Sequence, residues 1–269
     1  MITLLKNDND RVKFFAAQAL GRLKEKSATQ PLLDMIAINN NEDLYIRHTA
    51  VLALARIGDT TSMLELSTSE NKSLRLAAVL VLRKLQHPEI ASFLFDTDEY
   101  IVTETARAIN DDWSIEAALP ALAATLNDER FSSEPLLRRA INAALRVGTE
   151  KELEYLINFA KRDNVSSVLR GEALATLGTW SEPSVLDRVD GRYRGEIKRK
   201  PEIIKQKFGK DIPTFLESQD PEILIGISKT LSALNLDGYN SALFSIFKSI
   251  TDANVSSAVL NALGNFSFT

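Results

Sequence analysis

The chain has 269 residues, of which 45% are hydrophobic and 25% charged, and this composition is typical of a folded protein, not of a disordered one. Its formal net charge is −4, so no global positive field would draw the chain to nucleic acid or to anionic lipid. It contains no cysteine, which excludes disulfides, thiolate metal sites, iron–sulfur clusters, a cysteine nucleophile and covalent attachment of c-type haem within this chain.

A single compact core becomes hard to extend near this length, so the alternatives are two globular domains or one elongated array. Charged residues interrupt the apolar runs well before the roughly 18 residues that a membrane-spanning helix needs, so we expect no membrane insertion. Met1–Asp10 lacks the charged and then apolar layout of a signal peptide. The compartment is therefore left open by the sequence.

From the amino terminus onward, helical patterns alternate with short polar turns. Met1–Asp8 is typical of the last turns of a helix already under way, as if the chain had been cut inside an array. Eight segments then carry apolar residues at helical spacing, as Ile46, Ala50 and Leu54 do. These eight segments are Val12–Leu23, Ile46–Gly58, Leu74–Leu85, Ile101–Asp111, Leu136–Gly148, Leu169–Gly178, Ile223–Leu234 and Val255–Gly264. Partner helices are expected at Thr29–Ile38, Pro88–Phe95, Ile115–Leu126 and Lys151–Arg162. Glu202–Gly209, in an irregular stretch, has the pattern of a short helix.

Equivalent positions in the eight segments lie 34, 28, 27, 35, 33, 54 and 32 residues apart, which is the spacing of stacked helical pairs. Small residues recur at one helical position and would let neighbouring helices approach closely; they are Ala16, Ala50, Ala140 and Ala173. We therefore predict an all-α fold, a right-handed α-α superhelix of about eight helical pairs. Residues 1–269 would form one such solenoid, with an irregular basic insertion at about 181–210.

The amino-acid sequence of the repeats resembles that of a known family. Val12–Gly21 reads VKFFAAQALG and Leu169–Gly178 reads LRGEALATLG, and both are similar to the pattern V-R-x-x-A-A-x-A-L-G of phycobilisome-lyase-type HEAT repeats. The resemblance covers nearly the whole chain apart from Ser181–Lys210. It implies a HEAT/armadillo-like solenoid, but such repeats serve many unrelated functions.

A narrower resemblance concerns Asp43–Leu54, Lys72–Leu85, Asp98–Asp111 and Val185–Gly195. These segments resemble the HEAT segment of large secreted bacterial proteins, where it lies between a sorbosone/glucose-dehydrogenase-like β-propeller and a c-type cytochrome domain. The resemblance implies a periplasmic or secreted location. Because this chain has no propeller sequence and no Cys-x-x-Cys-His, any redox chemistry of that family would lie outside it.

The stretch Arg188–Lys210 contains nine basic and three acidic residues, a local net charge of +6. It is either a solvated insertion, with Tyr193, Ile204 and Phe208 packed on the solenoid, or a docking site for an acidic partner or an adjacent domain of the same polypeptide. Nucleic acid is the poorer candidate, because Tyr193 is the one aromatic residue among the charges of residues 188–200 and makes no stacking platform. The candidate partner-binding residues here are Arg188, Arg192, Tyr193, Arg194, Lys198, Arg199 and Lys200.

A second set of basic residues recurs near the starts of successive helices of the eight. Its members are Lys13, Arg47, Arg75, Arg138 and Arg170. We expect them to pair with acids of the neighbouring repeat; the alternative is a basic, partner-binding stripe along the concave surface. The two tryptophans, Trp113 and Trp180, follow two of these helices and are expected to be wedges that fill gaps between repeats.

Residues suited to catalysis are sparse. His48 and His87 are the only histidines, and neither lies in a metal-binding motif. Among the clustered acids, Glu104 has the spacing for a helix-surface ion pair with Arg107. We therefore predict no catalytic residue, metal or cofactor, and interpret the chain as a non-catalytic, monomeric interaction or scaffold module. The resemblance stated above implies that it is a segment of a larger secreted dehydrogenase-like protein. The alternatives are a free-standing peptide- or protein-binding HEAT protein, or a bilin-lyase-like enzyme that needs a bilin and a partner subunit.

Overall fold

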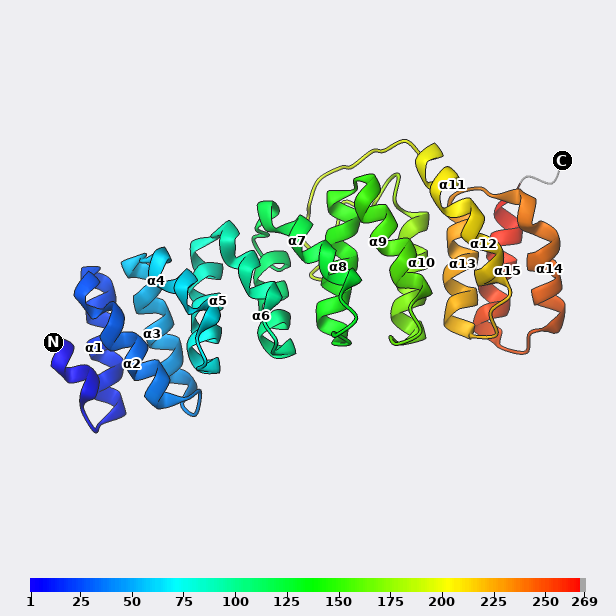
Figure 1. Cartoon of the computed structure of the whole chain (residues 1–269). Helices are drawn as coiled ribbons and strands as arrows, with labels where there is room; N and C mark the ends of the chain where they lie inside the picture. Colours follow the sequence, from blue (N-terminus) through cyan, green and yellow to red (C-terminus); the bar gives the residue numbers. More distant parts are fainter. Residues whose placement is uncertain (267–269) are drawn as a thin grey trace. The chain divides into compact units, whose positions relative to one another are not determined.

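The computed structural model describes residues 1–266 (Figure 1). These residues form α-helices and short 3-10 helices joined by turns, with no β-strand among them and one isolated β-bridge between Leu186 and Tyr193. The chain divides into two compact units, Met1–Ala118 and Leu119–Thr269. No helix in the described part of the chain combines the length and the apolar character needed to cross a membrane. The all-α prediction is confirmed.

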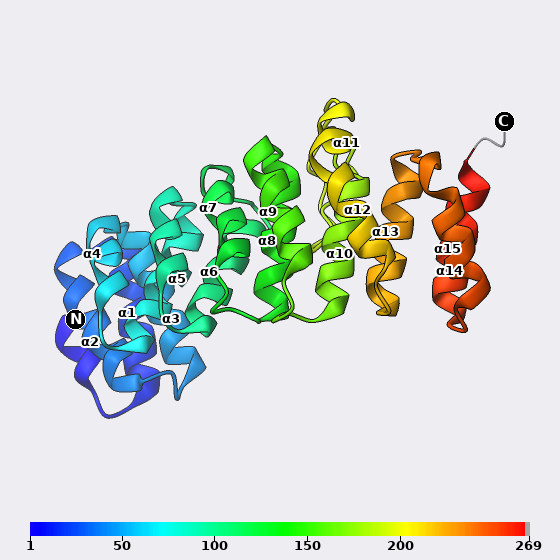
Figure 2. The same ribbon diagram turned by 45° about the vertical axis from the view of Figure 1, so that its right-hand side comes forward.

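In the first unit, helical pairs stack in chain order. The second helices α1, α3, α5 and α6 each contact the next along the row (Figures 1 and 2). Their partners pack alongside, as α2 does on α3 and η4 on α6. The elements are η1 (Ile2–Lys6), α1 (Asp10–Leu23), α2 (Thr29–Asn39), α3 (Leu44–Ile57), α4 (Thr60–Glu65), α5 (Lys72–Leu85), η4 (Pro88–Phe95) and α6 (Glu99–Asn110).

The second unit repeats this arrangement with longer connections. Helix α8 contacts α10, α10 contacts α13, and α13 contacts α15, so the second helices again form one row (Figure 2). Each of the eight predicted second helices is therefore present in the described residues. The elements are α7 (Leu119–Ala124), α8 (Glu134–Val147), α9 (Glu150–Lys161), α10 (Ser167–Gly178), α11 (Glu202–Phe208), α12 (Ile212–Leu216), α13 (Pro221–Ala233), α14 (Asn240–Ser249) and α15 (Ala253–Asn265).

Polar turn residues set where most second helices begin. In six of the eight, the side chain of the N-cap residue accepts hydrogen bonds from backbone N–H groups of the first turn, which no other backbone group would satisfy. Replacing such a cap with alanine typically costs about 1 kcal/mol. The six caps are Asn9, Asp43, Asn71, Asp98, Asp220 and Asp252.

The small residues that recur along the sequence lie where helices touch. Ala50, Ala140 and Ala173 are completely buried. Helices α10 and α13 lie very close to each other, because a Cβ added to Gly171 would lie 2.4 Å from the backbone oxygen of Glu222. A side chain at this position would push the two helices apart, so the tight stacking of the second unit depends on glycine there.

The helix predicted over residues 115–126 is not continuous in the structure. Residues 115–126 form a 3-10 turn, η5 (Glu116–Ala118), then α7 and a further 3-10 turn, η6 (Thr125–Asn127). Pro120 lies in the middle of this stretch, where it lacks an N–H and its ring clashes with the carbonyl group four residues earlier, so a continuous α-helix cannot form. The boundary between the two units falls at this break. The single solenoid over residues 1–269 stays a prediction.

Candidate functional site

The predicted basic insertion begins in an irregular segment, residues 181–200, that follows α10. A buried carboxylate holds this segment in place. The side chain of Asp187 is 0% exposed, and its Oδ2 accepts hydrogen bonds from Asn142 Nδ2 at 3.0 Å and from Arg194 Nε at 3.1 Å. Arg146 Nη1 lies 3.7 Å from the same oxygen. Because Asn142 and Arg146 belong to α8, Asp187 ties the segment to that helix.

The protonation state of Asp187 follows from these contacts. Burial raises the pKa of this carboxyl, but hydrogen bonds from the backbone N–H groups of Val189 and Asp190 and from the side chains of Asn142 and Arg194 outweigh burial. The net effect lowers the pKa of Asp187 below its ordinary value. The group is therefore an anion at neutral pH, and the arginines around it are the counter-charges of the fold.

Arg199 also serves the fold. Its guanidinium donates to the backbone oxygens of Leu145 at 2.7 Å, Arg146 at 3.0 Å and Trp180 at 2.7 Å, and it lies 4.9 Å from the centre of the Trp180 ring. The first two oxygens belong to the last turn of α8, where carbonyl groups have no partner within the helix. Arg199 thus closes the end of α8 and covers Trp180, which is 2% exposed.

Other members of the predicted basic set remain at the surface. Arg188 donates to the hydroxyl of Thr176, while Arg192, Lys198 and Lys200 are exposed. Tyr193 is 71% exposed, so its predicted packing against the solenoid is wrong. The same prediction is confirmed for Ile204 and Phe208, which are completely buried.

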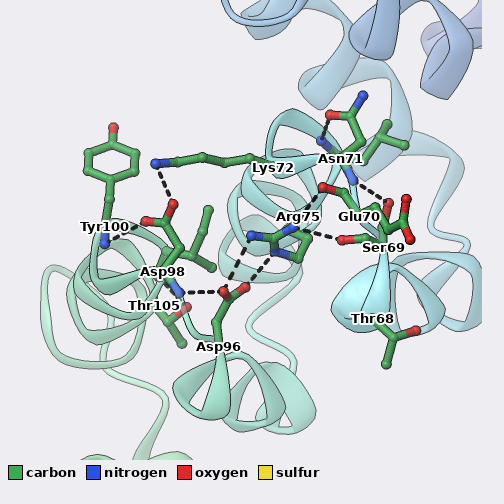
Figure 3. A network of polar contacts seen from close by, with 12 residues as sticks. Thr68, Ser69, Glu70, Asn71, Lys72, Arg75, Asp96, Asp98, Tyr100 and Thr105 are labelled. Atoms are coloured by element: carbon green, nitrogen blue, oxygen red, sulfur yellow. Dashed lines mark hydrogen bonds and ion pairs between the residues drawn. The ribbon is translucent and has the colours of Figure 1, made fainter. Parts of the chain in front are cut away.

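In the second basic set, Arg75 forms the densest contacts (Figure 3). Its Nε donates to Asp96 at 2.7 Å, and its Nη1 donates to the backbone oxygens of Ser69 at 2.7 Å and Glu70 at 3.2 Å. The guanidinium therefore joins the turn before α5 to the turn before α6. This is the predicted pairing between neighbouring repeats.

The other four residues of that set divide. Arg138 pairs with Glu172 of α10 at 2.7 Å, and so confirms the predicted pairing. The prediction is wrong for the other three residues, whose partners lie in their own repeat. Lys13 pairs with Asp10 at 2.6 Å, and Arg47 donates to the side chain of Asn41 at 3.4 Å. Arg170 donates to the backbone oxygen of Ala160 at 3.0 Å. Of these three, Arg47 has the longest contact, and its guanidinium keeps most of its five donors available.

Arg47 lines a surface hollow of the first unit that sequence reasoning missed. The hollow has a volume of about 490 Å³ and is bounded by α3, α5 and the turn after α6. We call it the Trp113 hollow. Its lining residues are Arg47, His48, Val51, Leu80, Arg83, Lys84, Gln86, Asp111, Asp112 and Trp113.

Trp113 is 75% exposed, so the prediction that it fills a gap between repeats is wrong, whereas it is confirmed for Trp180. The preceding residue, Asp112, has a φ of 57°, a left-handed conformation that turns the chain sharply at the end of α6. Asp112 also accepts a hydrogen bond from Arg83 at 2.9 Å. Lys84 is exposed and forms no ion pair within residues 1–266. The lining thus holds three cations against the two carboxylates of Asp111 and Asp112, one of which is paired with Arg83. This small excess of positive charge beside an aromatic face suits a carboxylate next to an apolar group.

The residues considered for catalysis do not converge. Glu104 pairs with Arg107 at 2.5 Å, as predicted. His48 lines the hollow, whereas His87 is the residue before η4. Residues 1–266 contain no group of three or more histidine, aspartate or glutamate side chains that could hold a metal ion.

Comparison with known proteins gives a family match for the first part of the chain. Residues 1–65 match the family model of HEAT repeats, which supports the predicted HEAT-like repeats in this part of the chain. Among solved structures, the chain is similar to the crystal structure of an engineered protein, with 17% sequence identity and a TM-score of 0.48. The alignment covers 98% of this chain and 77% of the engineered protein. A designed armadillo repeat protein is 15% identical, with a TM-score of 0.23, over 99% of this chain and 98% of that one. No curated protein matched the chain.

Proposed function

We propose that this chain is a non-catalytic protein-interaction module, and that the Trp113 hollow receives a short acidic segment of a partner polypeptide. The observation that carries the proposal is the exposure of Trp113, 75%, beside Arg47, His48 and Lys84. Tryptophan and arginine are enriched among the residues that dominate protein–protein binding energies. Stacked helical repeats commonly present such groups on an extended binding surface.

The partner's chemistry follows from the lining. A carboxylate entering the hollow meets Lys84, which has no ion pair within residues 1–266, and Arg47, whose one contact is long. An aliphatic side chain next to that carboxylate would cover the Trp113 ring. The surface covered on the ring and on that side chain contributes about 25 cal/mol per Å² before the ordering costs of association. The cations at the rim raise the association rate and make it sensitive to salt.

The wider context is also part of the proposal. The resemblance of Asp43–Leu54 and Lys72–Leu85 favours a HEAT segment of a larger, secreted dehydrogenase-like protein, in which the partner would be an adjacent domain. The proposal of a larger secreted protein rests on the amino-acid sequences of these segments alone. A free-standing binding protein, with the exposed Lys198 and Lys200 as further contacts, is the second candidate.

Peptide selection tests the proposal. A random peptide library displayed on phage is selected on the full chain, and enriched peptides are expected to contain aspartate or glutamate next to an aliphatic residue. Binding of these peptides should change the fluorescence of exposed Trp113 and leave that of buried Trp180. Trp113→Ala and Lys84→Glu should each weaken binding at least tenfold, whereas Lys26→Glu, an exposed lysine outside the hollow, should not. Peptides without carboxylates, or equal binding by all three variants, would refute the proposal.

A further inference from the structure

A second groove lies in the first unit, between the start of α1 and the facing sides of α2 and the α2–α3 turn. Its volume is about 990 Å³, twice that of the Trp113 hollow. We call it the Ile38 groove. Its lining residues are Leu5, Lys6, Asn7, Asp8, Asp10, Lys13, Pro31, Asp34, Met35, Ala37, Ile38, Asn39, Glu42, Asp43 and Ile46.

The charge of this groove is opposite to that of the basic set. Five carboxylates line it against two lysines. Lys13 is already paired with Asp10 at 2.6 Å. Asp8 and Glu42 are exposed and form no ion pair within residues 1–266. Lys6 is the other lining lysine, so the five carboxylates leave the groove with a net negative charge.

The remaining acids have local tasks that leave their charge in place. Asp43 caps α3 by accepting from the N–H groups of Tyr45 and Ile46 at 2.7 and 3.1 Å. Asp34 accepts from the side-chain amide of Gln30 at 2.7 Å. Both partners are neutral, so these bonds add no positive charge to the groove, and both carboxyl groups keep acceptor lone pairs for a donor of a partner.

The groove also has an apolar part. Ile38, on α2, is 81% exposed, the most exposed large hydrophobic side chain of the described residues. Three further apolar residues of the same lining, Leu5, Met35 and Ile46, are buried, and we call them the apolar floor of the groove. An isoleucine left in water beside such a floor is a place where an apolar side chain of a partner would remove surface from water.

We propose that the Ile38 groove binds a lysine- or arginine-rich segment of a different protein, with an apolar side chain of that segment packed on Ile38. The carboxylates of Asp8 and Glu42 select the basic character of the partner. The apolar floor selects one aliphatic side chain between its charges. This site is independent of the Trp113 hollow, which takes the opposite charge.

Fluorescence anisotropy with the full chain tests the site. The probe is a fluorescein-labelled peptide in which lysines flank a central leucine, and its matched control has serine in place of that leucine. The leucine peptide should bind at least fivefold more tightly. Binding should weaken steeply between 0.1 M and 1 M salt, where the Debye length falls from about 10 Å to about 3 Å.

Variants locate the contact. Asp8→Lys combined with Glu42→Lys should weaken binding at least tenfold, and Ile38→Ser should remove the preference for leucine over serine while keeping the salt dependence. Glu65→Lys, an exposed acid outside the groove, is the control and should bind as the parent does. Equal binding of both peptides to the parent, or parent-like binding by the double variant, would overturn the proposal.

Binding of a different protein must also be distinguished from self-association. A second copy of this chain could bind in the groove, because its Arg188–Lys210 is itself a basic segment. Sedimentation velocity over a range of protein concentrations distinguishes the two. A monomer at all concentrations agrees with a foreign partner. Concentration-dependent association that the double variant abolishes would show that the groove binds this chain's own basic segment, and would overturn the proposal.

Discussion

Replacing Asp187 should destabilise the second unit more than the loss of any surface acid. In Asp187→Ala, Arg194 and Arg146 lose the carboxylate that lies 3.1 and 3.7 Å away, although both side chains are only 11% exposed. Removing one partner from a buried ion pair typically costs 3–5 kcal/mol, roughly, because the other charge stays buried and uncompensated. We therefore expect about 3 kcal/mol, since Arg194 keeps Asp190 at 2.9 Å.

The effect should depend on pH with a definite sign. The folded pKa of Asp187 is lowered, so its contribution to the free energy of unfolding is fully present above the unfolded pKa, about 3.9. It is lost as the pH falls from that value through the folded pKa. The difference in stability between parent and Asp187→Ala should therefore be constant near neutral pH and shrink in acid.

Urea unfolding followed by circular dichroism measures this difference, and limited proteolysis shows whether residues 181–200 are released first. Glu182→Ala is the matched control in the same segment, since Glu182 is 75% exposed and lies 3.9 Å from Lys198, and it should change stability by less than about 0.5 kcal/mol. If Asp187→Ala unfolds at the same urea concentration as the parent, the carboxylate does not anchor the segment and the reasoning fails.

Three further predictions concern packing and the end of α8. Ala50→Leu and Ala173→Leu should each cost about 1–3 kcal/mol in thermal or urea unfolding, because both alanines are completely buried between helices. Gly171→Ala places a methyl group 2.4 Å from a backbone oxygen of α13 and should cost a similar amount, whereas Gly264→Ala, with no atom within 4 Å, should be neutral or slightly stabilising. Arg199→Ala removes the donor to two carbonyl oxygens of α8 and should cost about 1–3 kcal/mol, which Arg199→Lys should not restore; parent-like unfolding of either variant would contradict this.

The helices were predictable because their signals are local. The apolar spacing of Ile46, Ala50 and Leu54 and the polar turn before each helix depend only on neighbouring residues, and the structure has all eight second helices. The break at Pro120 was also readable, since a proline inside a helix removes a hydrogen bond wherever it occurs. The apolar spacing of residues 115–126 continues across Pro120, so spacing alone predicts one helix where the proline allows only a broken one.

The sites were not predictable because they depend on distant partners. Trp113 and Trp180 both follow a second helix, yet Trp180 is covered by Arg199, nineteen residues later in the chain, and Trp113 is left exposed. Asp187 lies in a stretch that reads as a solvated loop, and its partner Asn142 is 45 residues away. Neither the contact of Trp180 with Arg199 nor that of Asp187 with Asn142 can be predicted from the residues next to them in the sequence.

The basic stretch shows why net charge is a poor guide to a binding surface. Its local charge of +6 left two interpretations open, a solvated insertion and a docking site for an acidic partner. Arg194 instead pairs with Asp187 and Asp190, and Arg199 donates to backbone oxygens. Neither side chain could bind a partner without breaking the contacts that hold residues 181–200 in place. Charges available to a partner are those whose removal leaves the fold intact, such as Lys198, 73% exposed, and Lys84. Binding and stability measured on the same variants therefore separate the two kinds of basic residue, because a charge held by the fold changes both and a charge held for a partner changes binding alone.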